Sequence, residues 1–80
     1  MNWTREQLDT PLAQLEGWGL TVRVIGILER ANYVYVRDLE GVGKEDILSI
    51  TNIGSRGLVE LVSALTQFRE KGIPPEPLIE

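Results

Sequence analysis

The residues best suited to binding chemistry surround a turn in the second half of the chain. Asn52, Ile53 and Gly54 separate a short predicted helix from a longer one that opens with Ser55 and Arg56. Glycine permits a tight turn and a close approach of backbone to a partner, and the first amides of a helix lack acceptors and attract an anion. The pattern is typical of a helix-hairpin-helix, whose commonest anion is a DNA phosphate. An ordinary turn between two helices, capped by Ser55, fits the same residues.

Two arginines bear on this choice. Arg23 and Arg56 each fall in the first turn of a predicted helix, where the helix dipole disfavours a cation by about 0.3–1 kcal/mol. Either both side chains point into solvent and the small penalty is tolerated, or both stand beside a site that receives an anion. The residue types leave both interpretations open.

The residue inventory excludes most catalytic and metal chemistry. The chain has no cysteine and no histidine, which rules out disulfides, thiolate or imidazole zinc sites, cysteine nucleophiles and serine-histidine triads. Four acidic side chains could be considered as metal ligands, but solvated carboxylates at helix starts explain them better; they are Asp38, Glu40, Glu45 and Asp46. We therefore expect no catalytic residue, no metal and no cofactor.

Charge is unevenly distributed along the chain. A formal net charge of −4 by itself disfavours a nucleic-acid binder, because neutralising phosphates requires clustered lysine and arginine. However, residues 20–72 carry seven basic and seven acidic side chains, and the remaining acidic residues lie towards the two ends. The central part of the chain is neutral, so binding depends on whether its basic residues gather on one face.

The spacing of apolar residues predicts helices through most of the chain. Thr10 and Pro11 suit the start of a short helix or turn that ends at residues 17–19. Thr21 is the expected N-cap of a helix over about residues 21–31. The later elements are a connector at 33–36 leading into a one-turn helix near Asp38, a short helix at 44–50, and a clearly amphipathic helix at 55–71 that ends before Gly72.

These elements predict an all-α fold, a compact bundle of four or five short helices with SAM-like architecture that contains the helix-hairpin-helix. We expect an N-terminal flank over residues 1–19, one domain over 20–72, and a proline-rich extended tail over 73–80. Trp3 and Trp18 lack interleaved basic residues, so they are expected to cover the core rather than to stack on bases. The expected core residues are Val22, Ile25, Leu28, Leu39, Leu48, Leu58, Leu61, Val62 and Leu65.

Several segments together resemble one known family. They are Leu20-Thr21-Val22-Arg23, Leu28, Tyr35-Val36-Arg37-Asp38-Leu39, Ile47-Leu48-Ser49-Ile50 and Asn52-Ile53-Gly54-Ser55-Arg56. The sequence resembles the C-terminal domain of the bacterial RNA polymerase α subunit, without gaps from Leu20 to about Leu65. This resemblance implies a compact bundle of short helices that binds the minor groove of A+T-rich promoter DNA and contacts activators and sigma factor.

The resemblance also assigns site residues by position. Arg23 matches the family's principal minor-groove arginine, Gly54 its hairpin glycine, Arg56 a phosphate-contacting lysine, and Glu60 an acidic residue of the same surface. Including the adjoining hairpin positions and two departures from the family pattern, the predicted DNA-binding residues are Arg23, Gly26, Asn52, Gly54, Ser55, Arg56, Gly57 and Glu60.

The departures remove polar side chains from the predicted surface. Gly26 stands in place of a DNA-contacting asparagine, Gly57 in place of a contacting serine, and Ile27 occupies a further position of that surface. Close helix packing is the expected reason for a glycine at position 26, since glycine inside a helix costs about 0.8–1.0 kcal/mol relative to alanine. Residues 17–19 resemble an insertion just before the matched segment.

Two classes of function follow. The first is a non-catalytic, DNA-binding transcription module whose partners are A+T-rich duplex and, by the resemblance, RNA polymerase subunits, sigma factor or activators. The alternative is a protein-interaction module on the same fold, and an enzyme is the weakest option because no reaction has its residues. The first residues have neither a signal-sequence pattern nor a long apolar run, so we expect a cytoplasmic protein without a membrane partner.

Overall fold

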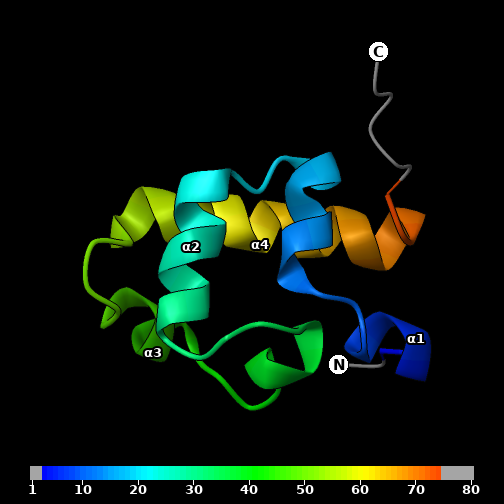
Figure 1. Cartoon of the computed structure of the whole chain (residues 1–80), viewed down its shortest axis with the longest axis horizontal. Coiled ribbons are helices and arrows are strands. Elements are labelled where there is room, and N and C mark those ends of the chain that lie inside the picture. The colour runs from blue at the N-terminus through cyan, green and yellow to red at the C-terminus, as the bar shows by residue number, and fades with distance from the viewer. Residues whose placement is uncertain (1–2, 75–80) are drawn as a thin grey trace.

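Within residues 3–74, six helical segments make up the fold, and the longest of them lies across the others (Figure 1). The computed structural model describes residues 3–74. The segments are α1 (Arg5–Leu8), η1 (Leu12–Trp18), α2 (Val22–Arg30), η2 (Val36–Leu39), α3 (Lys44–Leu48) and α4 (Gly54–Lys71), where η marks a 3-10 helix. Within residues 3–74 the β pairing is limited to one bridge between Pro11 and Tyr35. The predicted all-α class is confirmed.

Local signals account for the two longest helices. Thr21 caps α2, because its hydroxyl oxygen accepts a hydrogen bond from the Val24 amide at 3.3 Å. Helix α4 begins at Gly54, one residue before the predicted start, and ends at Lys71, because the next residue, Gly72, has a φ of +85° that is incompatible with a helix. The predicted one-turn helix near Asp38 is η2, and the predicted helix at 44–50 is the slightly shorter α3.

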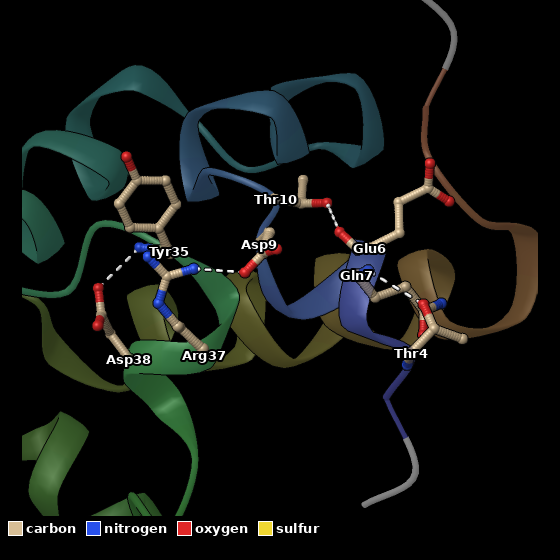
Figure 2. A network of polar contacts seen from close by, with 8 residues as sticks. All are labelled: Thr4, Glu6, Gln7, Asp9, Thr10, Tyr35, Arg37 and Asp38. Carbon is tan, nitrogen blue, oxygen red and sulfur yellow. Dashed lines mark hydrogen bonds and ion pairs between the residues drawn. The ribbon is translucent and has the colours of Figure 1, made fainter.

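Helix α1 is missing from the predicted elements, although its start carries a readable signal. The Thr4 hydroxyl oxygen accepts from the Gln7 amide at 3.0 Å, and the Gln7 side-chain oxygen accepts from the Thr4 amide at 2.9 Å. This reciprocal capping box satisfies two amides that a helix start otherwise leaves free. Thr10 begins no helix; its hydroxyl instead donates to the carbonyl oxygen of Glu6 at 2.8 Å, after α1 (Figure 2).

A polar clasp joins the N-terminal segment to η2 (Figure 2). The Arg37 guanidinium pairs with Asp9 at 2.7 Å and lies 4.4 Å from the centre of the Tyr35 ring. One Asp38 carboxylate oxygen accepts from the amides of Tyr35 and Val34, each at 2.9 Å. These two bonds and the nearby Arg37 hold the pKa of Asp38 below its ordinary value. Asp38 therefore caps η2, in agreement with a role as a helix-start carboxylate.

The core lies where α4 crosses η1 and packs against α3. Helix α4 contributes one narrow buried stripe, and η1 and α2 contribute most of the opposing side chains. Leu12 and Leu15 of η1 are fully buried, so the core continues into the N-terminal part of the chain. Among residues 3–74, the core cluster consists of fourteen buried residues, namely Leu12, Leu15, Leu20, Val24, Ile25, Ile27, Leu28, Val36, Leu39, Ile47, Ile53, Leu61, Ala64 and Phe68.

The predicted core is only partly correct. Ile25, Leu28, Leu39 and Leu61 are buried as expected. Three predicted core residues are instead exposed, namely Val22 (68%), Leu48 (41%) and Val62 (53%). Leu58 and Leu65 are partly buried at the edge of the core.

The error on α4 is one of rotation. Its buried residues are Gly57, Leu61, Ala64 and Phe68, spaced at i, i+4, i+7 and i+11. The predicted stripe is Leu58, Leu61, Val62, Leu65 and Phe68. Its members Leu61 and Phe68 are buried, whereas Leu58, Val62 and Leu65 lie to one side of the buried stripe. Both stripes are apolar, and the sequence pattern does not distinguish them. Glycine and alanine in the buried stripe allow the backbone to approach its neighbours closely.

Two tryptophans fasten the ends of the described residues onto α4. The Trp18 indole N–H donates to the Gly72 carbonyl at 2.9 Å, and the Gln67 side chain donates to the Trp18 carbonyl at 3.0 Å. Trp3 stacks on Phe68 with ring centres 5.6 Å apart. Both tryptophans are partly buried against the core, as predicted. Most of the predicted extended tail falls on residues 75–80, which lie outside the described residues.

We predict that Leu61→Ala lowers the free energy of unfolding by about 2–5 kcal/mol, because it removes a buried side chain and leaves a cavity. Val62→Ala is the matched control on the same helix turn. Since Val62 is half exposed, its truncation should change the free energy by no more than about 0.5 kcal/mol. Urea unfolding followed by circular dichroism measures both. Equal losses in the two variants would contradict the observed rotation of α4.

Candidate nucleic-acid interface

Arg23 lies on the hairpin between α3 and α4. Its side chain leaves the first turn of α2, is exposed, and donates from Nη1 to the Asn52 carbonyl oxygen at 3.2 Å. Asn52 presents that carbonyl from a left-handed backbone conformation with φ of +74°, which asparagine adopts more readily than most residues. The contact brings together two of the predicted site residues, which are 29 positions apart in the sequence.

The start of α4 has the features of an anion site. Gly54 has a φ of +64°, a conformation that favours glycine, and a side chain built there would point into open space. The cap residue Ile53 makes no side-chain hydrogen bond to the helix. Within residues 3–74, no hydrogen bond uses the amides of Gly54, Ser55 or Arg56 as donors. Three amides at the positive end of an 18-residue helix are thus available to an acceptor.

Ser55 and Arg56 are both exposed at this helix start. Ser55 follows the first residue of α4 and does not cap it. Ser55 is therefore not the cap that the ordinary-turn alternative assigned to it. The residue before the helix is Ile53, and its buried side chain anchors the hairpin to the core.

The two departures from the family pattern differ in their surroundings. A Cβ atom at Gly57 would lie 2.6 Å from Cγ1 of the buried Ile53, so this glycine exists for packing and does not belong to the exposed surface. A Cβ atom at Gly26 would meet only an Arg30 nitrogen at 3.9 Å, an ordinary contact. The expected packing reason for Gly26 is therefore wrong. It applies to Gly57 instead.

Glu60 faces the start of α2. One of its carboxylate oxygens accepts from both the hydroxyl and the amide of Thr21, each at 2.7 Å. These bonds, and then the positive charge of Arg23, lower the pKa of Glu60 below its ordinary value of 4.5. The carboxylate thus ties α4 to the first turn of α2 and places a negative charge beside Arg23. Sequence reasoning identified Thr21 only as a helix cap, because nothing local links it to a residue 39 positions away.

The eight predicted site residues therefore form two adjoining groups of three, with two glycines outside them. Arg23, Asn52 and Glu60 are linked around the start of α2, and Gly54, Ser55 and Arg56 form the first turn of α4 beside Asn52. Gly26 lies half-buried one turn along α2, and Gly57 is buried. The Glu60 carboxylate also belongs to the surface around Arg23, so this surface is not purely basic.

Metal-binding and membrane-spanning features are not found among the described residues. This part of the molecule holds no cluster of three acidic, histidine or cysteine side chains that could bind a metal ion. Asp46, one of the acidic residues considered above, instead accepts from the Gly43 amide at 2.9 Å and caps α3. None of the helices in residues 3–74 has the length and apolar character needed to cross a membrane.

A family model for the C-terminal domain of the bacterial RNA polymerase alpha subunit matches residues 2–67. The protein belongs to this family. The resemblance through Leu20 to Leu65 is thus confirmed, and the matched region also takes in α1 and η1.

Individual relatives agree with the family match. The sequence is 43% identical over 61 residues to the "DNA-directed RNA polymerase subunit alpha" of Prochlorococcus marinus (strain MIT 9312), covering 74% of this chain and 20% of that protein. Proteins of the same name from Tupiella akineta and Mycoplasma mobile are 39% and 30% identical over 64 and 67 residues. The shared part is 80% and 84% of this chain but 11% and 20% of those proteins. The chain spans a fifth or less of the alpha subunits it matches.

The two helical glycines of this alpha C-terminal domain predict opposite effects of one substitution. Gly26→Ala should stabilise the fold by up to about 1 kcal/mol, because alanine loses less backbone entropy and has room. Gly57→Ala should destabilise it, because overpacking against Ile53 costs about 1–3 kcal/mol and outweighs the gain in helix propensity. Thermal melts of both variants beside wild type are the measurement. Two shifts of the same sign would refute the packing described.

The bonds to Glu60 predict a pH-dependent contribution to stability. A carboxyl whose pKa is lowered in the folded state stabilises the fold fully above its unfolded pKa, near 4.5, and less as pH falls through the lowered pKa. Glu60→Gln should therefore be less stable than wild type at pH 7 and close to it at pH 2. Urea unfolding at several pH values measures the difference in free energy of unfolding between wild type and variant. The contribution of Asp38, which is present in both proteins, cancels in this difference. A difference independent of pH would mean that the charge of Glu60 does not contribute to stability.

Proposed function

We propose that this domain binds double-stranded DNA as a non-catalytic part of the transcription machinery in the cytoplasm. In this proposal Arg23 enters the minor groove of A+T-rich duplex, and the first turn of α4 receives a backbone phosphate. The family and its named relatives support a role in transcription. The observation that carries the DNA interface is the contact between Arg23 and Asn52, which sets a cationic side chain beside the free amides of α4.

In this proposal two parts of the surface have different roles in binding DNA. A guanidinium has five N–H donors, so the single bond to the Asn52 carbonyl leaves donors for the acceptor atoms of the groove. Narrow A+T minor grooves concentrate negative potential and favour an inserted arginine. Phosphate contacts from backbone amides and from Arg56 position the domain without reading sequence. Preference for A+T-rich duplex thus arises from Arg23, and general affinity from the start of α4.

Glu60 limits the strength of this binding. Its carboxylate stands beside Arg23 and repels an approaching phosphate. Gly26 and Gly57 offer no side-chain donors in place of the family's asparagine and serine. We therefore expect micromolar or weaker affinity that falls steeply with salt.

The same carboxylate is the observation that favours the alternative function. An arginine paired with an acidic neighbour can bind a mixed-charge protein surface as well as DNA, and the exposed Val22 adds an apolar contact on the same helix turn. Sigma factor or an activator, the partners implied by the family resemblance, would then meet this surface in place of DNA. The two functions predict different ligands for one set of residues.

The test is fluorescence anisotropy with A+T-rich and G+C-rich duplexes at two low salt concentrations. Arg23→Ala should weaken binding to the A+T-rich duplex and abolish the preference between duplexes. Arg56→Ala should weaken binding to both duplexes equally and reduce the slope of log affinity against log salt concentration by about one unit. Arg5→Ala, an exposed arginine of α1, is the control and should behave as wild type.

Chemical-shift mapping with the A+T-rich duplex shows where the contact lies. The proposal expects shifts of the amides of Arg23, Asn52, Gly54, Ser55 and Arg56. If no amide shifts, or if the shifts gather around Trp18, DNA is not the ligand of this surface and the protein-interaction function takes its place.

A further inference from the structure

Helix α4 carries more apolar surface than the core covers. Its buried stripe runs through Leu61 and Phe68, yet Leu58, Val62 and Leu65 beside it are also apolar. Val62 is 53% exposed, and Leu58 and Leu65 are only partly buried. Positions 58, 62 and 65 follow the i, i+4, i+7 spacing by which one helix packs on another. Within residues 3–74 no element covers them fully.

Two adjoining cavities lie along this stripe. The first, of about 220 Å³, is walled by η2, α3 and α4, and the second, of about 250 Å³, by Trp3 and the later turns of α4. Val62 and Leu65 line both, so the cavities form one groove. Helix α3 packs against α4, and in the view of Figure 1 it lies towards the first half of α4 while α1 lies towards the second half. From Leu58 to Arg69 the groove spans about 16 Å, or three helical turns.

The two cavities of the groove are each lined by one charge, and the two charges have the same sign. Among the described residues, Lys44 is the one charged residue lining the first cavity, and Arg69 the one lining the second. The lining is otherwise apolar apart from Thr66. A ligand with an apolar face and negative charge near both ends complements it.

The same charges disfavour a second copy of the molecule as the occupant. A two-fold interface across the groove brings the α4 helices together either parallel or antiparallel. The parallel arrangement places Lys44 near Lys44, and the antiparallel one places Lys44 near Arg69. Cations meet cations in both, which costs free energy in a partly desolvated interface.

We propose that this groove binds an acidic amphipathic helix of a partner protein. Its apolar residues at i, i+4 and i+7 would pack on Leu58, Val62 and Leu65, and its terminal carboxylates would pair with Lys44 and Arg69. This is the helix-in-groove mode of peptide recognition. The site is independent of the proposed DNA surface: residues 60 and 62 point about 160° apart around α4, and Glu60 faces α2.

The experiment selects ligands for the whole 80-residue protein from displayed helical peptides. Each peptide of about 14 residues keeps leucine at i, i+4 and i+7, with the flanking positions randomised among Glu, Lys, Ser and Ala. The selected peptides should carry Glu near both ends. Amide shifts caused by the best peptide should lie in residues 58–69 and 44–47 and should persist in Arg23→Ala.

Matched variants then locate the contact. Val62→Lys should weaken binding of the peptide by about tenfold or more, whereas Val22→Lys, at an exposed valine of α2 outside the groove, should leave affinity nearly unchanged. The double variant Lys44→Glu with Arg69→Glu should lose the acidic peptide and bind its Lys-flanked counterpart. Circular dichroism melts verify that each variant is folded.

Several results would overturn the proposal. These are selection of no peptide, enrichment of Lys over Glu, insensitivity to Val62→Lys, or shifts confined to the hairpin. A concentration-dependent dimer dissolved by Val62→Lys would identify a second copy as the occupant. Peptide binding only after truncation at Pro74 would identify residues 75–80 of the same molecule.

Discussion

The close approach of α4 to the rest of the molecule is the constraint on which the structure depends. The small residues Gly57 and Ala64 are both buried on the face of α4 that packs on η1 and α3, and a Cβ atom at Gly57 would lie 2.6 Å from Cγ1 of Ile53, the buried residue just before the helix. Small residues at two of four core positions fix both the rotation of α4 and its distance from its neighbours. The buried Ile53 holds the hairpin at the point where α4 begins, so the direction of its first amides follows from this packing.

The second consequence of that packing is electrostatic. With α4 fixed in rotation, Glu60 meets the amide and hydroxyl of Thr21 and holds the start of α2 against α4. The same turn of α2 carries Arg23, which reaches the hairpin at Asn52. One carboxylate therefore stabilises the junction that positions the arginine and also opposes an anion approaching it. A fold that needs Glu60 for this junction accepts weaker binding of phosphate at the adjoining surface.

Sequence reasoning was sufficient where a signal is local. The Thr21 cap and the apolar spacing of α2 predicted that helix, and the glycines at 54 and 72 bounded α4 to within one residue. The capping box from Thr4 to Gln7 is equally local and was readable. The rotation of α4 could not be read from the sequence, because apolar residues occupy both candidate stripes. The sequence also did not reveal that Gly57, and not Gly26, is the glycine required by packing, or that Thr21 donates to Glu60. Each of these facts depends on how the side chains pack in the folded molecule.

The ambiguous stripe of α4 is itself informative. A helix that buries one face of a small domain usually has polar residues elsewhere, so a second apolar stripe misleads pattern analysis for a physical reason. Here the extra stripe lies between Lys44 and Arg69, while Glu60 leaves the helix on the other side towards α2. The buried stripe of α4 lies between the groove and the side of the helix that carries Glu60, so these two surfaces face different directions. On our two proposals, one copy of the domain therefore has room for DNA at the hairpin and for a partner helix in the groove at the same time.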